Sequence, residues 1–566
     1  MEKSNLNVLG ISCYYHDSAA VLLKEGSIVA AVEEERFTRK KHDNSFPSNA
    51  VNYCLEKGDL EEKDVDYVVF HEKPVTKFMR ILQTFVDVFP RGFKFFRESM
   101  PDWVNRKLVV RSEIQKNLEE FDGKILFSKH HLSHASAAFH PSPFEEAAIV
   151  TLDGVGEWTT TGISKGKDKK IETLKKIDFP HSIGLLYSTV TSFLGFMVNN
   201  DEYKIMGLAS YGEPVYEQDL KENVVYLKED GSYELNMDYF SFRSSQKMWS
   251  QNFEELLGKP RQPDAKITKR DKDLAASLQK ITEELVLNIV ERAHELTDQK
   301  NLCMSGGVAL NSSCNGMLRK KSSFEKIWVQ PAATDAGDAL GAATYLYNHV
   351  LDKKRIPAMN HVYLGPGFSN DEIKKTLDEQ GANYRRMEDQ ELVEEVSSLL
   401  EDFKVVSWFQ GRMEWGPRAL GNRSILGNPK KQETMDIINK KVKHREDFRP
   451  FAPSVLEEKA EDYFDITYQS PYMLFVFDVK QDKRNEIPAV THVNGTSRIQ
   501  TVDRKTNPLY HRLIERFGEK TGTPVVLNTS FNVKGEPIVL SPKDAYRCFS
   551  KTGIDHMAIG NYLVNG

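Results

Sequence analysis

Short apolar runs separated by polar turns predict β strands in the first part of the chain. Residues 8–12, 19–23 and 28–32 have the apolar character of buried strands, and the first two are separated by the polar turn 15–18. Residues 65–70 form another apolar run of similar length, which predicts a further buried strand. The pattern therefore predicts a small sheet that begins with strand, turn and strand.

The same pattern returns at residues 145–157, where an Asp153-Gly154 turn separates two apolar runs. Two such units are expected of a duplicated actin-like ATPase fold, in which both turns face the phosphates of a nucleotide. Asp153 would supply a carboxylate for a metal, and the backbone N–H of Gly154 can approach an anion because no Cβ obstructs it. Asp-Gly is also the commonest hairpin signal, so an ordinary hairpin remains an alternative.

Helical periodicity appears at residues 48–57 and 271–298. Residues 75–120 are rich in aromatic and basic side chains, which raises RNA binding as one interpretation. The spacing is helical and no RNA-binding signature is present, so an amphipathic helical insertion is favoured. Residues 213–270 are polar and irregular, and we expect hairpins and loops there.

Proline and glycine mark a change of organisation after residue 350, and residues 351–389 are predicted to be a linker. Apolar strands recur beyond it at residues 405–409 and 525–528. We expect two α/β domains, residues 1–350 and residues 390–566.

His130 and His134 stand four residues apart in a run that continues with small residues. On a helix this spacing places both imidazoles on one face, where a divalent metal can bridge them if an acid arrives from elsewhere. Two histidines at this spacing alone are more often ordinary helix residues. The acid is therefore needed to favour a metal site.

Two further turns combine small residues with polar groups. Gly306-Gly307 follows a predicted strand and precedes Asn311 at a helix start, a pattern that lets a flat ligand or an anion approach the backbone. Asp335 and Asp338 lie in a small-residue turn that leads into another helix. Either carboxylate is a candidate for the missing acidic ligand.

The C-terminal domain concentrates cations among glycines, prolines and aromatic residues. Arginine in such a rigid setting suits a phosphate or carboxylate, because the guanidinium offers a planar fork. The strand at residues 525–528 leads into hydroxyl and amide groups that can hydrogen-bond a small anion or a nucleotide. The cations of these segments are Arg412, Arg418, Arg423, Lys443, Arg445 and Arg449, and the strand adds Asn528 and Ser530.

Composition narrows the class of protein. With 28% charged residues, 40% hydrophobic residues and a net charge of −6, the 566-residue chain has the balance of a soluble globular protein and no global basic field for nucleic acid. Its five cysteines are scattered without a CxxC pair, which fits a reducing cytosol. No signal-peptide pattern and no run of 18 apolar residues is present. We expect a cytoplasmic protein without a membrane partner.

Eight motifs in order resemble the O-carbamoyltransferase family, which includes nodulation and antibiotic-tailoring enzymes. The resemblance covers about residues 7–345 and 390–565. It implies an N-terminal domain similar to the tRNA-modifying enzyme Kae1 and a C-terminal domain with a YrdC-like mixed sheet. The motifs are His16-Asp17-Ser18-Ala19-Ala20, residues 34–42, His130-His131-Leu132-Ser133-His134-Ala135, Asp153-Gly154, residues 204–209, residues 306–311, residues 416–421 and residues 449–453.

The resemblance implies a two-site reaction. In the YrdC-like domain, carbamoyl phosphate would give carbamate, which attacks the α-phosphorus of ATP to form carbamoyl-adenylate. The Kae1-like domain would then transfer the carbamoyl group to a hydroxyl of a small molecule, such as a sugar or natural product. A closed passage between the two reactions would limit hydrolysis of these fragile intermediates. The family also makes a homodimer possible.

The resemblance also assigns roles by motif. It implies His130, His134, Asp153 and Asp335 as metal ligands, with Asp335 preferred over Asp338 because Thr334-Asp335 matches the family's Thr-Asp motif. Iron(II) is the implied metal, and zinc or manganese would suit the same ligands; Mg²⁺ would accompany ATP. His16 is the candidate general base, and Lys41 is expected to contact the reacting group. The expected nucleotide and carbamoyl phosphate ligands are Gly154, Lys204, Gly306, Gly307, Asn311, Arg418, Lys443, Arg449, Arg498, Asn528 and Ser530.

Two alternatives stay open at this stage. One is a threonylcarbamoyl-type tRNA-modifying enzyme with both halves fused, against which the net charge and the motif at residues 416–421 argue. The other is a nucleotide-binding protein with an actin-like core and no chemistry, which the metal-type and arginine motifs disfavour.

Overall fold

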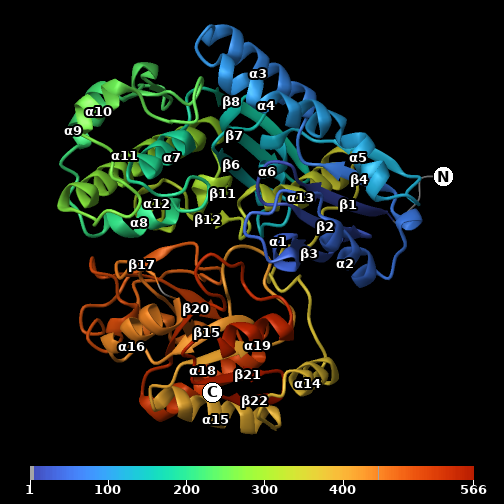
Figure 1. Ribbon diagram of the computed structural model, residues 1–566, viewed down its shortest axis with the longest axis vertical. Coiled ribbons are helices and arrows are strands. Elements are labelled where there is room, and N and C mark those ends of the chain that lie inside the picture. The colour runs from blue at the N-terminus through green and yellow to red at the C-terminus, as the bar shows by residue number, and fades with distance from the viewer. Residues whose placement is uncertain (1–5, 444) are drawn as a thin grey trace. The chain divides into compact units, whose positions relative to one another are not determined.

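The computed structural model describes residues 6–443 and 445–566 and divides into two compact units (Figure 1). The N-terminal unit comprises the chain up to Glu34 and Asn44–Met359, and the C-terminal unit comprises Glu35–Asp43 and Asn360–Gly566. The short segment Glu35–Asp43, which contains α1 (Glu35–Thr38), therefore folds with the second half of the chain. Its Phe37 packs beside the buried cluster of Met413, Ile538 and Leu540.

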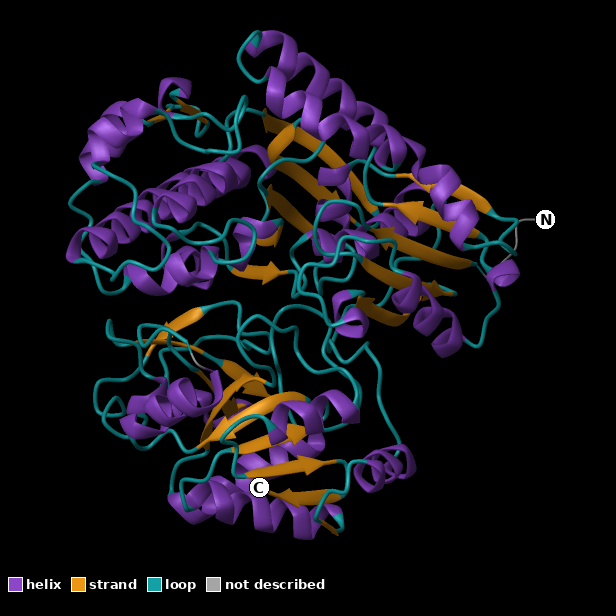
Figure 2. Ribbon diagram, in the orientation of Figure 1, coloured by secondary structure: helices purple, strands orange, loops and turns teal. Residues whose placement is uncertain are grey.

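Two five-stranded sheets of the same topology build the N-terminal unit (Figure 2). In each, the first strand pairs antiparallel with the second and parallel with the fourth. The identical order confirms the predicted duplication. The first sheet, in the order β3-β2-β1-β4-β5, contains β1 (Asn7–Ser12), β2 (Ala19–Lys24), β3 (Ser27–Glu33), β4 (Tyr67–Phe70) and β5 (Lys124–Phe127). The second, in the order β12-β11-β6-β7-β8, contains β6 (Glu146–Leu152), β7 (Thr159–Lys167), β8 (Lys170–Asp178), β11 (Asn301–Ser305) and β12 (Lys326–Val329).

Two equivalent helices, one after the last strand of each sheet, pack closely together. They are α6 (His130–Phe139) and α13 (Asp335–Thr344), and both are rich in alanine. A Cβ on Gly341 would lie 1.8 Å from the Ser133 carbonyl oxygen, so only glycine permits this approach. The contact brings together the N-terminal turns of both helices, which carry the histidines and aspartates.

Other helices complete the N-terminal unit. A single 29-residue helix, α11, contributes much of the buried face beside the second sheet and begins with a Thr268–Asp271 capping box. These helices are α2 (Ser48–Gly58), α7 (Ile183–Phe193), α8 (Glu202–Ala209), α9 (Glu217–Asn223), α10 (Gln251–Leu257), α11 (Lys269–Thr297) and α12 (Ser312–Lys321).

The predicted helical insertion is confirmed between β4 and β5. It consists of α3 (Pro74–Val88), α4 (Phe93–Asn105) and α5 (Val110–Asn117), and the rings of Phe85 and Phe96 stack at 4.1 Å between α3 and α4. The segment 213–270 contains the predicted hairpin, β9 (Val225–Leu227) with β10 (Tyr233–Leu235), but also the helices α9 and α10. The expectation of hairpins and loops alone was therefore wrong there.

An eight-stranded mixed sheet organises the C-terminal unit, as predicted for this half. Helices α15 (Asp389–Glu401) and α18 (Pro508–Thr521) pack on it around the buried Trp408 and Phe517. The sheet, in the order β13-β22-β21-β14-β15-β20-β16-β19, contains β13 (Tyr384–Arg386), β14 (Val406–Phe409), β15 (Arg423–Gly427), β16 (Ala452–Leu456), β19 (Gln500–Val502), β20 (Val525–Ser530), β21 (His556–Ile559) and β22 (Tyr562–Asn565). The remaining elements include α16 (Gln432–Ile437), α17 (Ala460–Tyr463), α19 (Pro542–Ser550) and the pair β17 (Val476–Asp478) and β18 (Thr496–Arg498).

The linker prediction for residues 351–389 requires correction. This stretch contains α14 (Asn370–Glu379), which starts with a Ser369–Glu372 capping box, and the edge strand β13, which pairs with β22. The sequence of β13, Tyr384-Arg385-Arg386, has no apolar run, so the pattern gave no strand signal. Within the described residues, no helix has the length and apolar character needed to cross a membrane.

Candidate metal and anion sites

The two predicted histidines lie at the start of α6 and are completely buried. Their rings meet edge to face with centroids 4.7 Å apart, which confirms that the four-residue spacing puts both on one face. Glu157 fixes this turn, because its Oε1 accepts a hydrogen bond of 3.0 Å from the His130 backbone N–H. The histidines are therefore held before any ligand binds.

Acids from the second half of the duplicated fold converge on the Nε2 side of these rings. Asp153, which follows β6, places Oδ2 3.3 Å from His130 Nε2. Asp335, the first residue of α13, places Oδ1 3.7 Å from His130 Nε2 and 3.8 Å from His134 Nε2. The structure thus brings all four predicted ligands together.

Asp338 approaches the same histidines from their other nitrogens. Its Oδ1 lies 2.6 Å from His134 Nδ1 and its Oδ2 lies 3.5 Å from His130 Nδ1. His130, His134, Asp335 and Asp338 offer ligand atoms that all lie within 4.8 Å of one another, so this group could hold a metal. Asp335 therefore lies on the Nε2 side of the histidine rings, and Asp338 lies on their Nδ1 side. When an imidazole binds a metal through one nitrogen, a carboxylate commonly orients the ring from the other nitrogen.

Burial controls the electrostatics of this cluster. It lowers the pKa of His130 and His134, raises the pKa of Asp335 to about 6, and raises the pKa of Asp338 well above its ordinary value. Burial also acts on Asp153, but the hydrogen bond and charges of the neighbouring histidines outweigh it and lower the pKa of Asp153. His134 Nε2 and Asp335 Oδ2 are buried without a hydrogen-bond partner. Neutral imidazoles, acids and these orphaned atoms fit a divalent cation.

Glu72 extends the cluster on the side of the first sheet, although the sequence pattern did not indicate it. Its Oε2 lies 3.9 Å from His130 Nδ1 and accepts a 2.6 Å hydrogen bond from Lys77 Nζ. Burial would raise the pKa of Glu72, but Lys77 and the nearby histidines lower it to about 2. Its position just beyond the carboxyl end of β4 was the one available signal.

His16 lies at the edge of the same cluster, in the turn between β1 and β2. Its Nε2 is 4.0 Å from Asp335 Oδ2, and its Nδ1 is 3.1 Å from Asp17 Oδ2. Burial disfavours the charged ring, but the carboxylates of Asp17 and Asp335 outweigh it and raise the pKa of His16 well above its ordinary value. Lys41 belongs to the segment that folds with the C-terminal unit, and its contact with the reacting group stays a prediction.

The glycine turn after β11 lies against Asp153. Gly306 has φ +95, and a Cβ there would lie 2.2 Å from the Leu152 carbonyl oxygen. The Gly307 N–H donates to Asp153 Oδ1 at 3.1 Å. A Cβ on Gly154 would meet nothing within 4 Å, so the backbone of this turn is open to a ligand.

Two other predicted nucleotide ligands make structural contacts. Asn311 caps α12 by accepting from the Cys314 N–H, and it exchanges hydrogen bonds with Gln279. Lys204 belongs to α8, and its Nζ lies 3.0 Å from Oδ1 of Asp201, the residue before this helix. These contacts account for both residues without a nucleotide, and their ligand role stays a prediction.

The C-terminal unit gathers the predicted cations. Burial and the charges of Arg418, Arg445 and Arg449 lower the pKa of Arg498 well below its ordinary value, so the positive charge of these arginines acts on one buried guanidinium. Arg445 also stacks on Phe451, with its guanidinium 4.3 Å from the ring centroid. Arg445 is one of the cations that the sequence pattern indicated for an anion.

Lys443 and Ser530 are joined in the same region. Lys443 Nζ donates to the Ser530 carbonyl oxygen and, at 2.8 Å, to Asn532 Oδ1. Burial, with the charges of Arg445 and Arg449, lowers the pKa of Lys443 well below its ordinary value. An anion would offset this concentration of positive charge.

Two buried side chains shape the loop that carries Arg418. Asn528 donates to the Ala419 carbonyl oxygen at 3.3 Å. Glu414 accepts hydrogen bonds from three backbone N–H groups, those of Leu420 at 2.7 Å, Asn422 at 2.7 Å and Arg423 at 3.1 Å. The role of Glu414 was not predicted, because it depends on the folded path of the loop.

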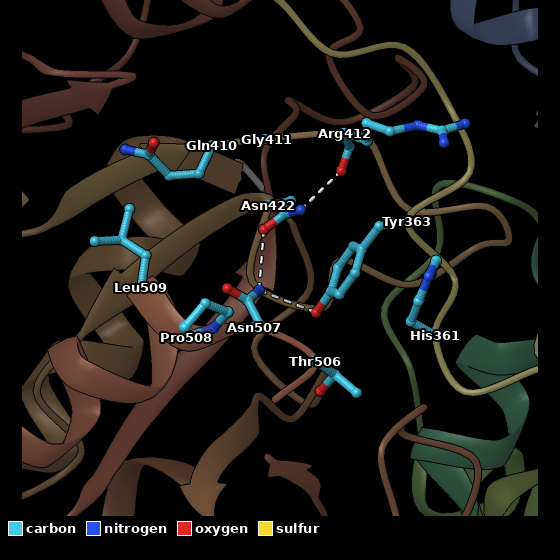
Figure 3. A pocket seen from close by; sticks show the side chains of 10 residues that line it. All are labelled: His361, Tyr363, Gln410, Gly411, Arg412, Asn422, Thr506, Asn507, Pro508 and Leu509. Carbon is cyan, nitrogen blue, oxygen red and sulfur yellow. Dashed lines mark hydrogen bonds between the residues drawn. The ribbon is translucent and has the colours of Figure 1, made fainter. Parts of the chain in front are cut away.

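A separate cavity of about 430 Å³ lies within the C-terminal unit (Figure 3). Asn507 links two of its walls by donating to Tyr363 Oη and to Asn422 Oδ1, both at 3.0 Å. Arg412, one of the cations that the sequence pattern indicated, lines it, but none of the residues to which the family resemblance assigns a ligand role does. Its lining residues are His361, Tyr363, Gln410, Gly411, Arg412, Asn422, Thr506, Asn507, Pro508 and Leu509.

Comparison with known proteins places both halves of the chain. The family description "Carbamoyltransferase N-terminus" matches residues 7–344, and "Carbamoyltransferase C-terminus" matches residues 397–566. A Synechocystis protein is 46% identical over 99% of this chain and 96% of its own length.

Two named relatives agree with these matches. The nodulation protein NolNO of Sinorhizobium fredii is 37% identical over 97% of this chain and 79% of its own. The 3'-hydroxymethylcephem-O-carbamoyltransferase of Amycolatopsis lactamdurans is 30% identical over 77% of this chain and 80% of its own. Since both family descriptions together span most of the sequence, this chain is an enzyme of the carbamoyltransferase family.

Proposed function

We propose that this protein is an ATP-dependent O-carbamoyltransferase whose two units catalyse successive reactions. The observation that carries the proposal is the chemical contrast between the units. The C-terminal unit crowds arginines around Arg498, whereas the N-terminal unit buries histidines and aspartates around His134. The first chemistry suits phosphates and the second suits a metal-assisted transfer.

Activation of the carbamoyl group is assigned to the C-terminal unit. Arg418, Arg449 and Arg498 would bind carbamoyl phosphate and the phosphates of magnesium-bound ATP, and offset the charge that concentrates there. Water cleaves carbamoyl phosphate to carbamate and inorganic phosphate. A carbamate oxygen then attacks the α-phosphorus of ATP, the bond to the β-phosphate oxygen breaks, and carbamoyl-adenylate and pyrophosphate form.

Transfer is assigned to the N-terminal unit, where the backbone around Gly154 and Gly307 would hold the adenylate. The hydroxyl oxygen of the acceptor attacks the carbamoyl carbon, its proton passes to His16 Nε2, and the bond to the phosphate oxygen breaks to release AMP. Burial of the cluster excludes water, which would otherwise hydrolyse the adenylate.

His130, His134, Asp153 and Asp335 would hold a divalent metal, with iron(II) as the expected ion. When bound, such an ion supplies Lewis-acid stabilisation of negative charge on the phosphate or carbonyl oxygen. Asp338 would support the imidazoles from the other side, because its carboxyl oxygens lie 2.6 Å from His134 Nδ1 and 3.5 Å from His130 Nδ1. A cation at Asp335 also offsets the carboxylate charge that raises the pKa of His16, which favours the neutral ring that a general base needs.

The acceptor is proposed to be a small molecule with a free hydroxyl, since the net charge of −6 offers no field for nucleic acid. The test incubates the full-length protein with ATP and carbamoyl phosphate and measures pyrophosphate. We expect pyrophosphate release that depends on carbamoyl phosphate. If threonine, bicarbonate and ATP give threonylcarbamoyl-adenylate while carbamoyl phosphate gives no pyrophosphate, the proposal is wrong.

A further inference from the structure

Arg80 is a buried arginine of the N-terminal unit whose guanidinium forms no hydrogen bond or ion pair with the residues that the structure describes. The residue is 8% exposed, and its Nε and Nη1 atoms are buried without a hydrogen bond. Among residues 6–443 and 445–566, no carboxylate forms an ion pair with it. A buried charge without a partner is costly, so its presence calls for a physical reason.

The acids nearest to Arg80 are already engaged by other groups. The charges of Glu72 and Glu157 act on the guanidinium, yet burial dominates and lowers its pKa. Glu72 Oε2 is bound by Lys77 Nζ at 2.6 Å. Glu157 Oε1 accepts from the backbone N–H groups of Lys73 at 2.9 Å and His130 at 3.0 Å. The positive charge of Arg80 is therefore left without a counterion.

Among the described residues, an aromatic ring contacts the guanidinium of Arg80, and no acceptor bonds to its buried Nε and Nη1 atoms. Its guanidinium lies 4.9 Å from the ring centroid of Phe179, so an aromatic ring covers one face of the planar group. A guanidinium fixed in this way still presents two parallel N–H groups along its edge. That edge matches the two oxygens of a carboxylate or of a tetrahedral oxyanion.

A chain of contacts connects Arg80 with the proposed general base. Lys77 lies one turn before it on α3, with Nζ 4.3 Å from the ring centroid of Tyr15. The Tyr15 ring in turn lies 4.8 Å from the ring of His16, centroid to centroid. Because Lys77 and Arg80 are three residues apart on α3, they share a helix face, and Tyr15 links Lys77 to His16.

We propose that Arg80 binds an anionic group, a carboxylate or a phosphate-type oxyanion, on the acceptor that is carbamoylated beside His16. This inference rests on the proposed function and narrows its acceptor to an anionic hydroxyl compound. Helix α3 belongs to the insertion between β4 and β5, which thereby becomes a determinant of acceptor specificity. The cations Lys77 and Arg80 differ in role, because Glu72 forms its ion pair with Lys77.

The first test compares the ligand-free full-length protein with Arg80→Met by thermal unfolding. A methionine covers Phe179 without a buried charge, so we expect the melting temperature to rise. Arg355→Met is the matched control: Arg355 also lies over an aromatic ring, Phe139 at 4.4 Å, but it donates to the Phe139 carbonyl oxygen at 2.7 Å. The control should melt at a lower temperature. A lower melting temperature for Arg80→Met as well would make Arg80 structural and overturn the proposal.

The second test locates an anion directly. Crystals of the full-length protein are soaked in selenate, a tetrahedral oxyanion that anomalous scattering identifies. We expect a selenium peak within hydrogen-bond distance of the Arg80 guanidinium, which is lost in Arg80→Met and weakened in Arg80→Lys, where the fork is gone. No peak beside Arg80 in the unmodified protein overturns the proposal. A peak that persists in Arg80→Met shows an adventitious ion only, and it also overturns the proposal.

The third test separates the acceptor from the adenylate as the source of the anion. AMP binding is measured by calorimetry in the unmodified protein and in Arg80→Met. We expect less than a twofold change in AMP affinity, because Arg80 binds the acceptor. A tenfold loss would show that Arg80 holds the adenylate phosphate. Pyrophosphate release from carbamoyl phosphate and ATP is measured in parallel. If no pyrophosphate is released, the proposed function is wrong. The selenate experiment would still show whether Arg80 binds an anion.

Discussion

Asp338 Oδ1 lies 2.6 Å from His134 Nδ1, on the ring edge opposite the Nε2 atom that faces Asp335. This contact fixes the orientation of His134 and favours the tautomer that keeps Nε2 available as a ligand. The preference for Asp335 as ligand then has a geometric basis, since each of the two acids serves a different nitrogen of the same ring.

Asp338→Asn should weaken metal binding without abolishing it. The amide still reaches the Nδ1 edge but loses the charge that supports the imidazole, so we expect metal affinity to fall about 10- to 100-fold. Competition with a chromophoric chelator measures the change. Asp335→Asn, which removes a proposed ligand, should lose more affinity, and equal losses for the two variants would contradict this division of roles.

Metal affinity should fall as the pH drops through about 6. Burial raises the pKa of Asp335 to about 6, so below that pH the carboxyl group holds a proton that a metal must displace. For this group alone, each further unit of acidification costs roughly tenfold in affinity. Chelator titrations between pH 5 and 8 measure it, on the unmodified protein and on Asp335→Asn. A variant with the same pH profile would assign the proton to another residue.

His130→Ala should separate the two partial reactions. The change removes a proposed ligand of the N-terminal unit, so carbamoyl transfer should be lost, while pyrophosphate release from carbamoyl phosphate and ATP stays within about twofold of the unmodified rate. The control is His140→Ala at the opposite end of the same helix, because the His140 ring contacts Ser136 and the Lys169 carbonyl oxygen instead. If His130→Ala loses both reactions while His140→Ala keeps them, the assignment of the two reactions to separate sites is wrong.

The sequence predicted features that depend on short-range spacing. The four-residue interval of His130 and His134 determines a shared helix face wherever the helix packs, and Asp153 and Asp335 were identifiable because each ends a strand or begins a helix. The duplication was visible for the same reason, as an internal repeat of strand, turn and strand.

Roles that arise from packing could not be predicted in this way. Glu72 and Glu414 act on groups that only the folded chain brings to them, and no local pattern distinguishes them from solvated acids. The edge strand β13 is polar because one of its sides has no neighbouring strand, so it lacked the apolar signal on which the linker prediction depended. Helix α1 was not assigned to the C-terminal unit, since its contacts are distant in sequence.

Arg449→Ala should impair activation and spare the metal site. Arg449 belongs to the group whose charges crowd Arg498, so its loss removes part of the positive charge that binds phosphate. We expect pyrophosphate release to fall at least tenfold and metal content to stay unchanged. Arg504→Ala, which removes an exposed ion pair with Glu515, is the control for loss of an arginine from the same unit. An unaffected rate in Arg449→Ala would place phosphate binding elsewhere.

Glu414→Gln should show how far the loop around Arg418 depends on one carboxylate. Glu414 Oε1 accepts from the N–H groups of Leu420, Asn422 and Arg423. A charged acceptor makes each of these bonds stronger than an amide oxygen can, so the variant should lose about 1–3 kcal/mol of stability. The looser loop should also raise the KM for carbamoyl phosphate more than it lowers kcat, because Arg418 would be misplaced before binding. Denaturant unfolding and pyrophosphate kinetics measure the two effects. Reduced stability with an unchanged KM would confine Glu414 to a structural role, separate from the position of Arg418.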